Sequence, residues 1–163
     1  AALASHPGVR HISFTGSVAV GSLIQAAAAK NAVPVTLELG GKSPQIVFAD
    51  ADLQSAATIA VALKHRNAGQ VCAAPSRFYL HESIHDEFVK AFVEKSRALK
   101  LGSGTQKATQ MGPLTMFKRV EAMQRLTEDA CAHGATRPQW LLHIESRTFL
   151  SRRVRAIGAL RVE

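Results

Sequence analysis

Residues 11–30 read His-Ile-Ser-Phe-Thr-Gly-Ser-Val-Ala-Val-Gly-Ser-Leu-Ile-Gln-Ala-Ala-Ala-Ala-Lys. The run over residues 11–15 predicts a short strand that ends at Gly16. Apolar residues then recur at helical spacing, so we expect a helix from about residue 18 to residue 30, with Ser17 as its N-cap. Residues 33–39 alternate between polar and apolar side chains, which predicts a second strand.

Strands and helices continue to alternate along the rest of the chain. We expect Asp50 and Asp52 to cap a helix over residues 53–66, which is apolar on nearly every face through residues 59–63 and is therefore expected to be buried. A capping box, Ser83-Ile84-His85-Asp86, precedes the next helix. The remaining predicted elements are strands over residues 46–48 and 78–80 and a last helix over 115–131. This order is typical of an α/β fold with a largely parallel sheet flanked by helices.

The composition is that of an ordinary soluble globular chain. Of 163 residues, 47% are hydrophobic and 20% are charged, which excludes a disordered or fibrous protein. The only cysteines are Cys72 and Cys131, too few for a disulfide framework in a chain of this length. The start of the chain shows no signal peptide, and the longest uncharged run is too polar to span a membrane, so we expect a cytoplasmic protein.

The formal net charge of +8 is the feature that suggests an anionic partner. Half of the excess lies in residues 136–163, which hold six arginines, no lysine and two glutamates. This segment shows no clear periodicity and supplies no well-capped element. We therefore predict a boundary near Ala135, and a nucleic-acid-binding module that uses the basic tail remains an alternative function.

The first candidate site is the turn between the strand over residues 11–15 and its helix. A glycine at this turn, Gly16, lets the backbone approach a ligand, and the helix N-terminus presents N–H groups to a phosphate or another anion. Gly21 follows one turn later. The alternative is a tight strand-to-helix turn in which Ser17 serves only as the cap, because the full dinucleotide fingerprint is missing.

The second candidate is Glu38, within Glu38-Leu39-Gly40-Gly41-Lys42-Ser43-Pro44. It stands at the carboxyl end of an otherwise apolar strand, where parallel α/β sheets bind their ligands. A carboxylate partly removed from water has a raised pKa and can act as a general base. The alternative is a solvated acid at a strand end, paired with Lys42.

The third candidate is Cys72, which follows the helix-breaking loop Asn67-Ala68-Gly69-Gln70. A cysteine in such a loop can be exposed enough to act as a nucleophile, although free cysteines are more often inert core residues. We interpret Cys131, between two alanines in a predicted helix, as a packing residue. The seven histidines form no ligand-spaced pair, so no metal site is expected; His81 and His85 are interpreted as surface residues.

Together the three clusters resemble the NAD(P)-dependent aldehyde dehydrogenase superfamily. The order of the motifs agrees with that family, and so does the interval from Glu38 to Cys72. The resemblance runs from about residue 1 to Ala135. The motifs that carry it are Phe14-Thr15-Gly16-Ser17 with Gly21, Glu38-Leu39-Gly40-Gly41-Lys42-Ser43-Pro44, and Gly69-Gln70-Val71-Cys72 with Ser76-Arg77.

The resemblance implies oxidation of an aldehyde to a carboxylic acid with NAD or NADP. Cys72 would attack the aldehyde carbonyl as a thiolate, and its backbone N–H would give one donor to the oxyanion. After hydride transfer, Glu38 would activate the water that hydrolyses the resulting thioester.

The resemblance also assigns the cofactor-binding residues. Gly16 and Ser17 would line the cofactor cleft, Gly21 would lie in the helix behind them, and the Leu39 backbone would face the nicotinamide amide. No metal is implied, and the partner is a small-molecule aldehyde, with no nucleic acid and no membrane.

Family members are several times longer than this chain, so the resemblance implies a fragment. Residues 1–38 would be the end of the NAD(P)-binding domain, residues 39–135 the first part of the catalytic domain, and residues 136–163 a tail unrelated to the family. The parent enzyme would be a homo-oligomer whose oligomerisation segment is absent here. We expect little or no NAD-linked oxidation by this chain alone. An inactive gene remnant, with a tail from a shifted reading frame, remains an alternative.

Overall fold

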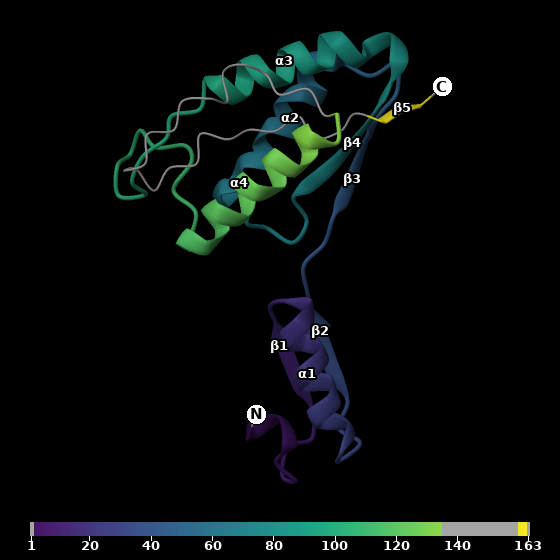
Figure 1. Cartoon of the computed structure of the whole chain (residues 1–163), viewed down its shortest axis with the longest axis vertical. Coiled ribbons are helices and arrows are strands. Elements are labelled where there is room, and N and C mark those ends of the chain that lie inside the picture. The colour runs from purple at the N-terminus through teal and green to yellow at the C-terminus, as the bar shows by residue number, and fades with distance from the viewer. Residues whose placement is uncertain (1, 135–159, 163) are drawn as a thin grey trace. The chain divides into compact units, whose positions relative to one another are not determined.

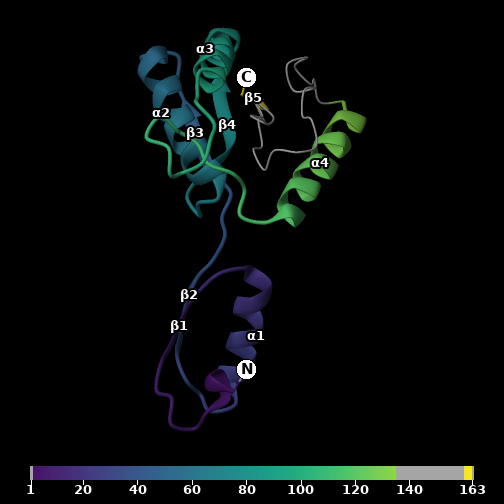
Figure 2. The same cartoon turned by 90° about the vertical axis from the view of Figure 1, so that its left-hand side faces the viewer.

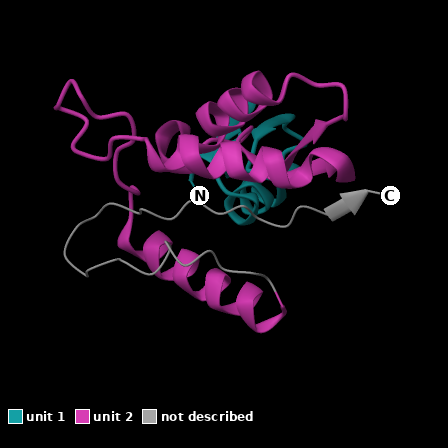
Figure 3. Cartoon of the chain, turned by 90° about the horizontal axis from the view of Figure 1, so that it is seen from above, with its two compact units in different colours: residues 1–41 teal, residues 42–163 magenta. Residues whose placement is uncertain are grey.

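The computed structural model describes residues 2–134 and 160–162, and the chain divides into two compact units (Figure 3). The first unit spans Ala1–Gly41 and the second spans Lys42–Glu163. Each unit is an α/β arrangement with parallel strands, as the alternating pattern of the sequence predicts.

The first unit is one strand–helix–strand element (Figure 1). A short 3-10 helix, η1 (Leu3–Ser5), precedes β1 (Ile12–Thr15), α1 (Val18–Ala29) and β2 (Val35–Glu38). The two strands pair in parallel, from Ile12 beside Val35 to Thr15 beside Glu38. The predicted N-cap is confirmed, because Ser17 Oγ accepts a hydrogen bond from Val20 N at 3.3 Å.

The second unit holds a three-stranded parallel sheet in the order β3 (Ser43–Val47), β4 (Pro75–His81) and β5 (Leu160–Val162). Strand β3 is longer than predicted, and the loop before β4 contains a 3-10 turn, η2. Of the two predicted caps of α2 (Leu53–His65), Asp52 is confirmed: its Oδ1 accepts from Gln54 N at 3.0 Å and from Ser55 N at 3.2 Å. Asp50 is not the cap, since the N-cap position is Asp52. The elements in chain order are β3 (Ser43–Val47), α2 (Leu53–His65), η2 (Arg66–Gly69), β4 (Pro75–His81), η3 (Glu82–Ile84), α3 (His85–Arg97), α4 (Phe117–Ala132) and β5 (Leu160–Val162).

Helices α2 and α3 pack against each other and cover β3 and β4 (Figures 1 and 2). Three phenylalanines from β4 and α3 form the centre of this core, with Phe78 and Phe92 in edge-to-face contact at a centroid distance of 5.4 Å. The ten buried core residues are Val47, Ala57, Ala60, Val61, Phe78, Leu80, Ile84, Phe88, Ala91 and Phe92. This core anchors β4, whose first residue follows the Cys72 loop directly.

The expectation that α2 is buried on nearly every face is wrong. Ile59 and Leu63 are 55% and 46% exposed, because the helix packs only through the face that carries Ala57, Ala60 and Val61. An apolar composition shows that a helix has a buried face, but it does not show how wide that face is.

The predicted capping box at residues 83–86 is also wrong. Residues Glu82–Ile84 form η3, and the side chain that caps it is His81, whose Nδ1 accepts from Ser83 N at 3.3 Å. Helix α3 begins at His85 with no side-chain cap. The Asp86 carboxylate instead contacts its neighbour, with Oδ1 2.7 Å from His85 Nδ1.

The predicted arginine-rich tail falls mostly on residues 135–159, which lie outside the described part of the chain. We expected no well-capped element after Ala135, and the structure has one three-residue strand there, β5, whose Leu160 pairs with Tyr79 of β4. In the part of the chain that the structure describes, no helix combines the length and apolarity needed to cross a bilayer.

Candidate functional site

The ends of β1 and β2 meet at one edge of the first unit. Gly16 N donates to Glu38 O at 2.9 Å, which extends the ladder by one residue beyond the pairing of Thr15 with Glu38. Since both strands are parallel, this edge is the carboxyl end of the sheet, where α/β proteins bind ligands. The structure therefore brings Gly16, Ser17, Glu38 and Leu39 to the same edge.

Helix α1 begins at this edge, with Ser17 as its N-cap. Residues 17–20 are exposed, and Ser17 Oγ satisfies the N–H of Val20. The N–H groups of Val18 and Ala19 belong to the first turn, where a helix offers no internal acceptor. The helix end can therefore receive an anion through two backbone donors and the positive end of the dipole.

The two glycines assigned to the cofactor site both have packing roles. Gly21 is buried, and a Cβ at this position would lie 2.8 Å from Leu39 Cδ2. Its missing side chain lets α1 approach the end of β2. A Cβ at Gly16 would collide with the ring of Phe14. A cofactor role for these residues stays a prediction, because packing against Phe14 and Leu39 is a second explanation for the two glycines.

The side chain of Glu38 is exposed, so the predicted withdrawal of its carboxylate from water is not seen. The position itself agrees with the prediction, since Glu38 is the last residue of β2. What fixes Glu38 is the backbone bond from Gly16, and no described residue of the first unit buries its carboxylate.

Cys72 lies in the loop between α2 and β4, and its thiol is exposed. The turn that contains it is closed by a hydrogen bond from Ala74 N to Val71 O at 3.0 Å. Just before it, Asn67, Ala68 and Gly69 all have positive φ angles, of 51°, 56° and 79°. This left-handed stretch ends the helix and turns the chain toward β4, as the predicted helix break requires.

Gln70 holds this loop with both ends of its amide, a role that the sequence reasoning did not identify. Its Nε2 donates to Asn67 O at 2.9 Å, and its Oε1 accepts from Thr115 N at 3.0 Å and from Thr115 Oγ1 at 2.7 Å. Thr115 is 45 residues away in sequence, just before α4. Only its place in the Gly69-Gln70-Val71-Cys72 motif distinguishes Gln70 in the sequence.

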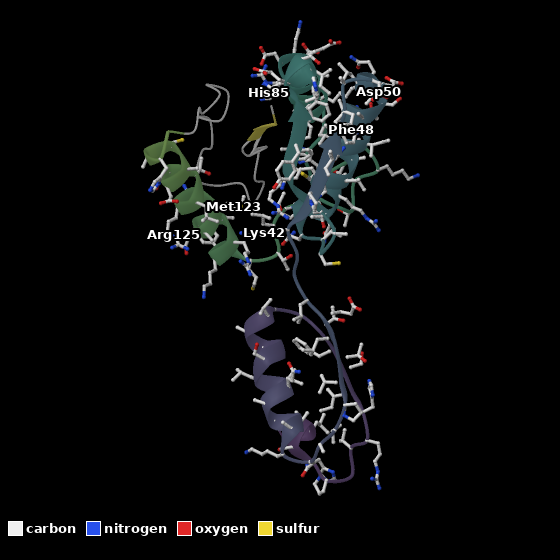
Figure 4. The ribbon with its side chains drawn as sticks, turned by 90° about the vertical axis from the view of Figure 1, so that its right-hand side faces the viewer. Lys42, Phe48, Asp50, His85, Met123 and Arg125 are labelled. Carbon is white, nitrogen blue, oxygen red and sulfur yellow. The ribbon has the colours of Figure 1, made fainter. Side chains whose placement is uncertain are left out.

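Arg77 joins the start of β3 to β4. Its Nη2 donates to Lys42 O at 2.8 Å, and Lys42 is labelled in Figure 4. Ser76 is the extra residue of β4 at a bulge, since Pro75 pairs with Ser43 and Arg77 pairs with Pro44. The Ser76-Arg77 pair therefore shapes the strand that follows Cys72.

The second cysteine, Cys131, lies half-buried in α4. This placement fits its interpretation as a packing residue. Among the described residues, no group of three or more His, Cys, Asp or Glu side chains is arranged to hold a metal ion.

The proposed base and the proposed nucleophile belong to different units. Glu38 ends β2 of the first unit, and Cys72 precedes β4 of the second. Within each unit the local geometry is defined: the carboxyl edge of a parallel sheet in the first, and an exposed thiol on a hydrogen-bonded loop in the second.

Comparisons of the sequence and the structure with known proteins identify the family of this chain. The sequence profile of the aldehyde dehydrogenase family matches residues 1–139. The chain belongs to the aldehyde dehydrogenase family. A mitochondrial aldehyde dehydrogenase of Leishmania tarentolae is 47% identical over 135 residues, which are 82% of this chain and 27% of that protein. Retinal dehydrogenase 2 of Mus musculus is also 47% identical, over 83% of this chain and 26% of its own.

Solved aldehyde dehydrogenases share the fold of this chain. The betaine aldehyde dehydrogenase of Staphylococcus aureus, in complex with NAD+, aligns with a TM-score of 0.79 at 38% identity. The alignment covers 82% of this chain and 27% of that structure. This aldehyde dehydrogenase chain thus spans about a quarter of the length of the relatives that it matches.

Proposed function

We propose that this chain carries the nucleophile and the water-activating base of an enzyme that oxidises an aldehyde to a carboxylic acid with NAD or NADP. The observation that carries the proposal is the exposed thiol of Cys72, held in a turn after three left-handed residues, within the segment that matches the family. An inert cysteine in a core would not be placed in this way.

Cys72 would open the reaction. As a thiolate, its Sγ adds to the aldehyde carbon and forms a C–S bond, while the carbonyl π electrons move to the oxygen. The backbone N–H of Cys72 lies in the same turn and would donate to that oxyanion. The product of this step is a thiohemiacetal on Cys72.

The first unit would hold the cofactor at the carboxyl edge of its sheet. The donor set at the N-terminus of α1, formed by the N–H groups of Val18 and Ala19, suits a pyrophosphate. Gly16 and Ser17 would line that contact, Gly21 would keep α1 close behind it, and the backbone of Leu39 would face the nicotinamide. The chemistry that the bound cofactor would supply is acceptance of a hydride from the thiohemiacetal carbon, which would leave a thioester on Cys72.

Glu38 would complete the cycle as a general base. Its carboxylate takes a proton from a water molecule, whose oxygen bonds to the thioester carbon. The C–S bond then breaks, the electron pair returns to Sγ, and the carboxylic acid leaves. The place of Glu38 at the carboxyl end of β2 supports this role, since ligands of parallel α/β sheets bind at that edge.

We further propose the domain assignment predicted from the sequence. Residues 1–38 would close the cofactor-binding domain and residues 39–135 would begin the catalytic domain. The boundary between the two compact units, at Gly41 and Lys42, supports this division. Since the chain spans about a quarter of its relatives, we expect little or no NADH formation by this chain alone. The cytoplasmic compartment also remains a prediction.

The test is acylation of Cys72 by p-nitrophenyl acetate, a reaction that needs a nucleophile and part of an oxyanion hole. Sγ attacks the ester carbonyl, p-nitrophenolate leaves with the electron pair, and the thiol proton goes to solvent. We expect a p-nitrophenolate burst and a mass increase of one acetyl group on the peptide that contains Cys72.

Cys131→Ala is the matched control, because it removes the other thiol of the chain. We expect Cys72→Ala to abolish the burst and Cys131→Ala to keep it. A burst that survives in Cys72→Ala would refute the nucleophile assignment. Aldehyde-dependent NADH production by the purified 163-residue chain would refute the expectation that the chain alone is inactive.

A further inference from the structure

The side chain of Gln70 forms hydrogen bonds on both sides of the Cys72 loop. Gln70 donates to Asn67 O at 2.9 Å and accepts two hydrogen bonds from Thr115, at 3.0 Å to the backbone N and 2.7 Å to Oγ1. Asn67 returns a bond, with its Nδ2 3.2 Å from Gln70 O. These contacts close the loop on itself and tie it to the segment that precedes α4.

This bracing is needed because the loop backbone is unfavourable by itself. Asn67 and Ala68 hold left-handed backbone conformations, with φ of 51° and 56°, and a Cβ makes that region costly for Ala68 in particular. Such a conformation persists only where the surroundings enforce it. A backbone bond from Gln70 N to Asn67 O at 3.1 Å already spans the strained residues. The Gln70 side chain adds a second bond to the same oxygen and links the loop to Thr115.

We infer that Gln70 is a positioning residue for Cys72, an inference that rests on the proposed function of Cys72 as the nucleophile. Gln70 stands two residues before the thiol, and the turn from Val71 to Ala74 follows it directly. By fixing the start of that turn, Gln70 sets the direction of both Sγ and the Cys72 N–H. The Thr115 contact ties the loop to a segment 45 residues away in sequence.

The bracing acts on the loop and not on the core. None of the residues from 66 to 73 belongs to the buried cluster between α2, α3 and the sheet. Thr115 is exposed, and Gln70 is half-buried. Loss of the Gln70 contacts should therefore loosen the loop while the core of the second unit stays folded.

Two reactions of the same thiol separate positioning from folding. Acylation by p-nitrophenyl acetate needs Sγ and the Cys72 N–H aligned on one carbonyl, whereas alkylation by iodoacetamide needs only an accessible thiolate. In alkylation Sγ bonds to the methylene carbon and iodide leaves with its electron pair. Both rates are read on the peptide that contains Cys72, which separates them from reaction at Cys131. At one pH both reactions use the same Cys72 thiolate fraction, so their rate ratio reports the geometry around the thiol.

We expect Gln70→Ala in the full chain to slow acylation at least about tenfold and to change alkylation less than about threefold. Thr115→Val removes the Oγ1 donor but keeps the backbone N–H, so it should slow acylation by a smaller factor. Thr115→Ser restores the hydroxyl and should restore the rate. Gln110→Ala is the matched control, because Gln110 Oε1 also accepts a backbone N–H, from Lys100 at 2.9 Å, in a different loop.

Each result decides the inference. An unchanged acylation rate in both Gln70→Ala and Thr115→Val would overturn it, and so would an equal fall of acylation and alkylation in a folded variant. If Gln70→Ala fails to fold, the comparison of Thr115→Val with Thr115→Ser gives the same decision. A wild-type chain that is not acylated at Cys72 would instead refute the proposed function itself.

Discussion

The two units use the same strand–helix order but differ sharply in burial. The second unit has a core of ten buried residues, whereas Gly21 and Ala28 are the only buried residues that the structure describes in the first. The loop of Cys72 is fixed by side-chain hydrogen bonds within its own unit, while Glu38 is fixed only through its backbone. Contacts within the second unit therefore fix the loop of the proposed nucleophile, Cys72. The described contacts within the first unit fix the backbone of the proposed base, Glu38, but not its carboxylate.

This difference separates two ways to place a catalytic group. A strand end sets the position of a backbone to within the sheet register, but it leaves an exposed side chain such as that of Glu38 free to rotate. A loop braced by buried or bonded side chains restrains the side-chain direction as well. Three predictions test this contrast between a core-rich unit and a core-poor unit.

The largest expected effect comes from the aromatic cluster of the second unit. Phe92 is 2% exposed and contacts the rings of Phe78, Phe88 and His65. Phe92→Ala should lower the free energy of unfolding of this unit by about 3–5 kcal/mol, since it removes a buried ring and leaves a cavity. Hydrogen exchange by mass spectrometry, in which peptides from residues 42–134 and 2–41 are read separately, measures the loss.

Phe48→Ala is the matched control, because Phe48 is 67% exposed beyond the end of β3 (Figure 4). It should change the exchange of the second unit by less than about 1 kcal/mol. A loss below about 1 kcal/mol for Phe92→Ala would show that the aromatic cluster does not stabilise this unit, and the contrast between the units would fail.

The second prediction concerns a buried histidine between α2 and α3. His65 is 8% exposed, and its Nε2 lies 3.1 Å from Ser96 Oγ. Burial, with a smaller contribution from the nearby Lys64 charge, lowers the pKa of His65 from 6.5 to about 4. Between pH 6.5 and about 4, the His65 imidazole is therefore protonated in the unfolded chain and mostly neutral in the folded chain.

Stability of the second unit should consequently fall as the pH drops from 6.5 toward 4, by up to about 1.4 kcal/mol per pH unit from this group. It should stop falling on account of His65 below pH 4, where both states are protonated. Urea titrations of the full chain at a series of pH values measure the slope. His65→Gln keeps a donor and an acceptor for Ser96 but does not titrate, so an equal slope in this variant would contradict the prediction.

Local signals in the sequence predicted the elements of the fold. Ser17 and Asp52 are caps because each offers an oxygen next to a run of helix-forming residues, and both act as expected. The capping box at residues 83–86 failed because His81, a side chain from the preceding strand, competes for the same N–H of Ser83. A local sequence pattern does not show which of two neighbouring side chains accepts the hydrogen bond from a given backbone N–H.

The sequence predicted only those residues of the candidate site whose own side chain would take part in the reaction. Cys72 and Glu38 stand out by residue type and by the motif around them. The contacts that brace the loop were not predictable, because Gln70 and Thr115 are 45 residues apart and hydrogen-bond through ordinary polar groups. The same holds for His65 and Ser96, 31 residues apart. Pairings of this kind depend on how α2, α3 and the loops pack, which no local pattern encodes.

The smallest predicted effect concerns the core-poor first unit. Gly21 lets α1 approach Leu39, and a Cβ there would lie 2.8 Å from Leu39 Cδ2 and 3.7 Å from Leu37 Cδ1. Gly21→Val should cost about 1–2 kcal/mol, because overpacking outweighs the few tenths of a kcal/mol that valine gains over glycine as a helix former. Hydrogen exchange in peptides from residues 2–41 measures this change.

Ala26→Val is the control for Gly21→Val, since it places the same side chain at an exposed position of α1. It should lower stability only by the helix-propensity difference between alanine and valine, about 0.5 kcal/mol. An equal loss of unfolding free energy in the two variants would mean that α1 does not pack tightly against Leu39 at the end of β2. The close approach would then no longer explain Gly21, and the assignment of this glycine to the cofactor site would stand without a packing alternative.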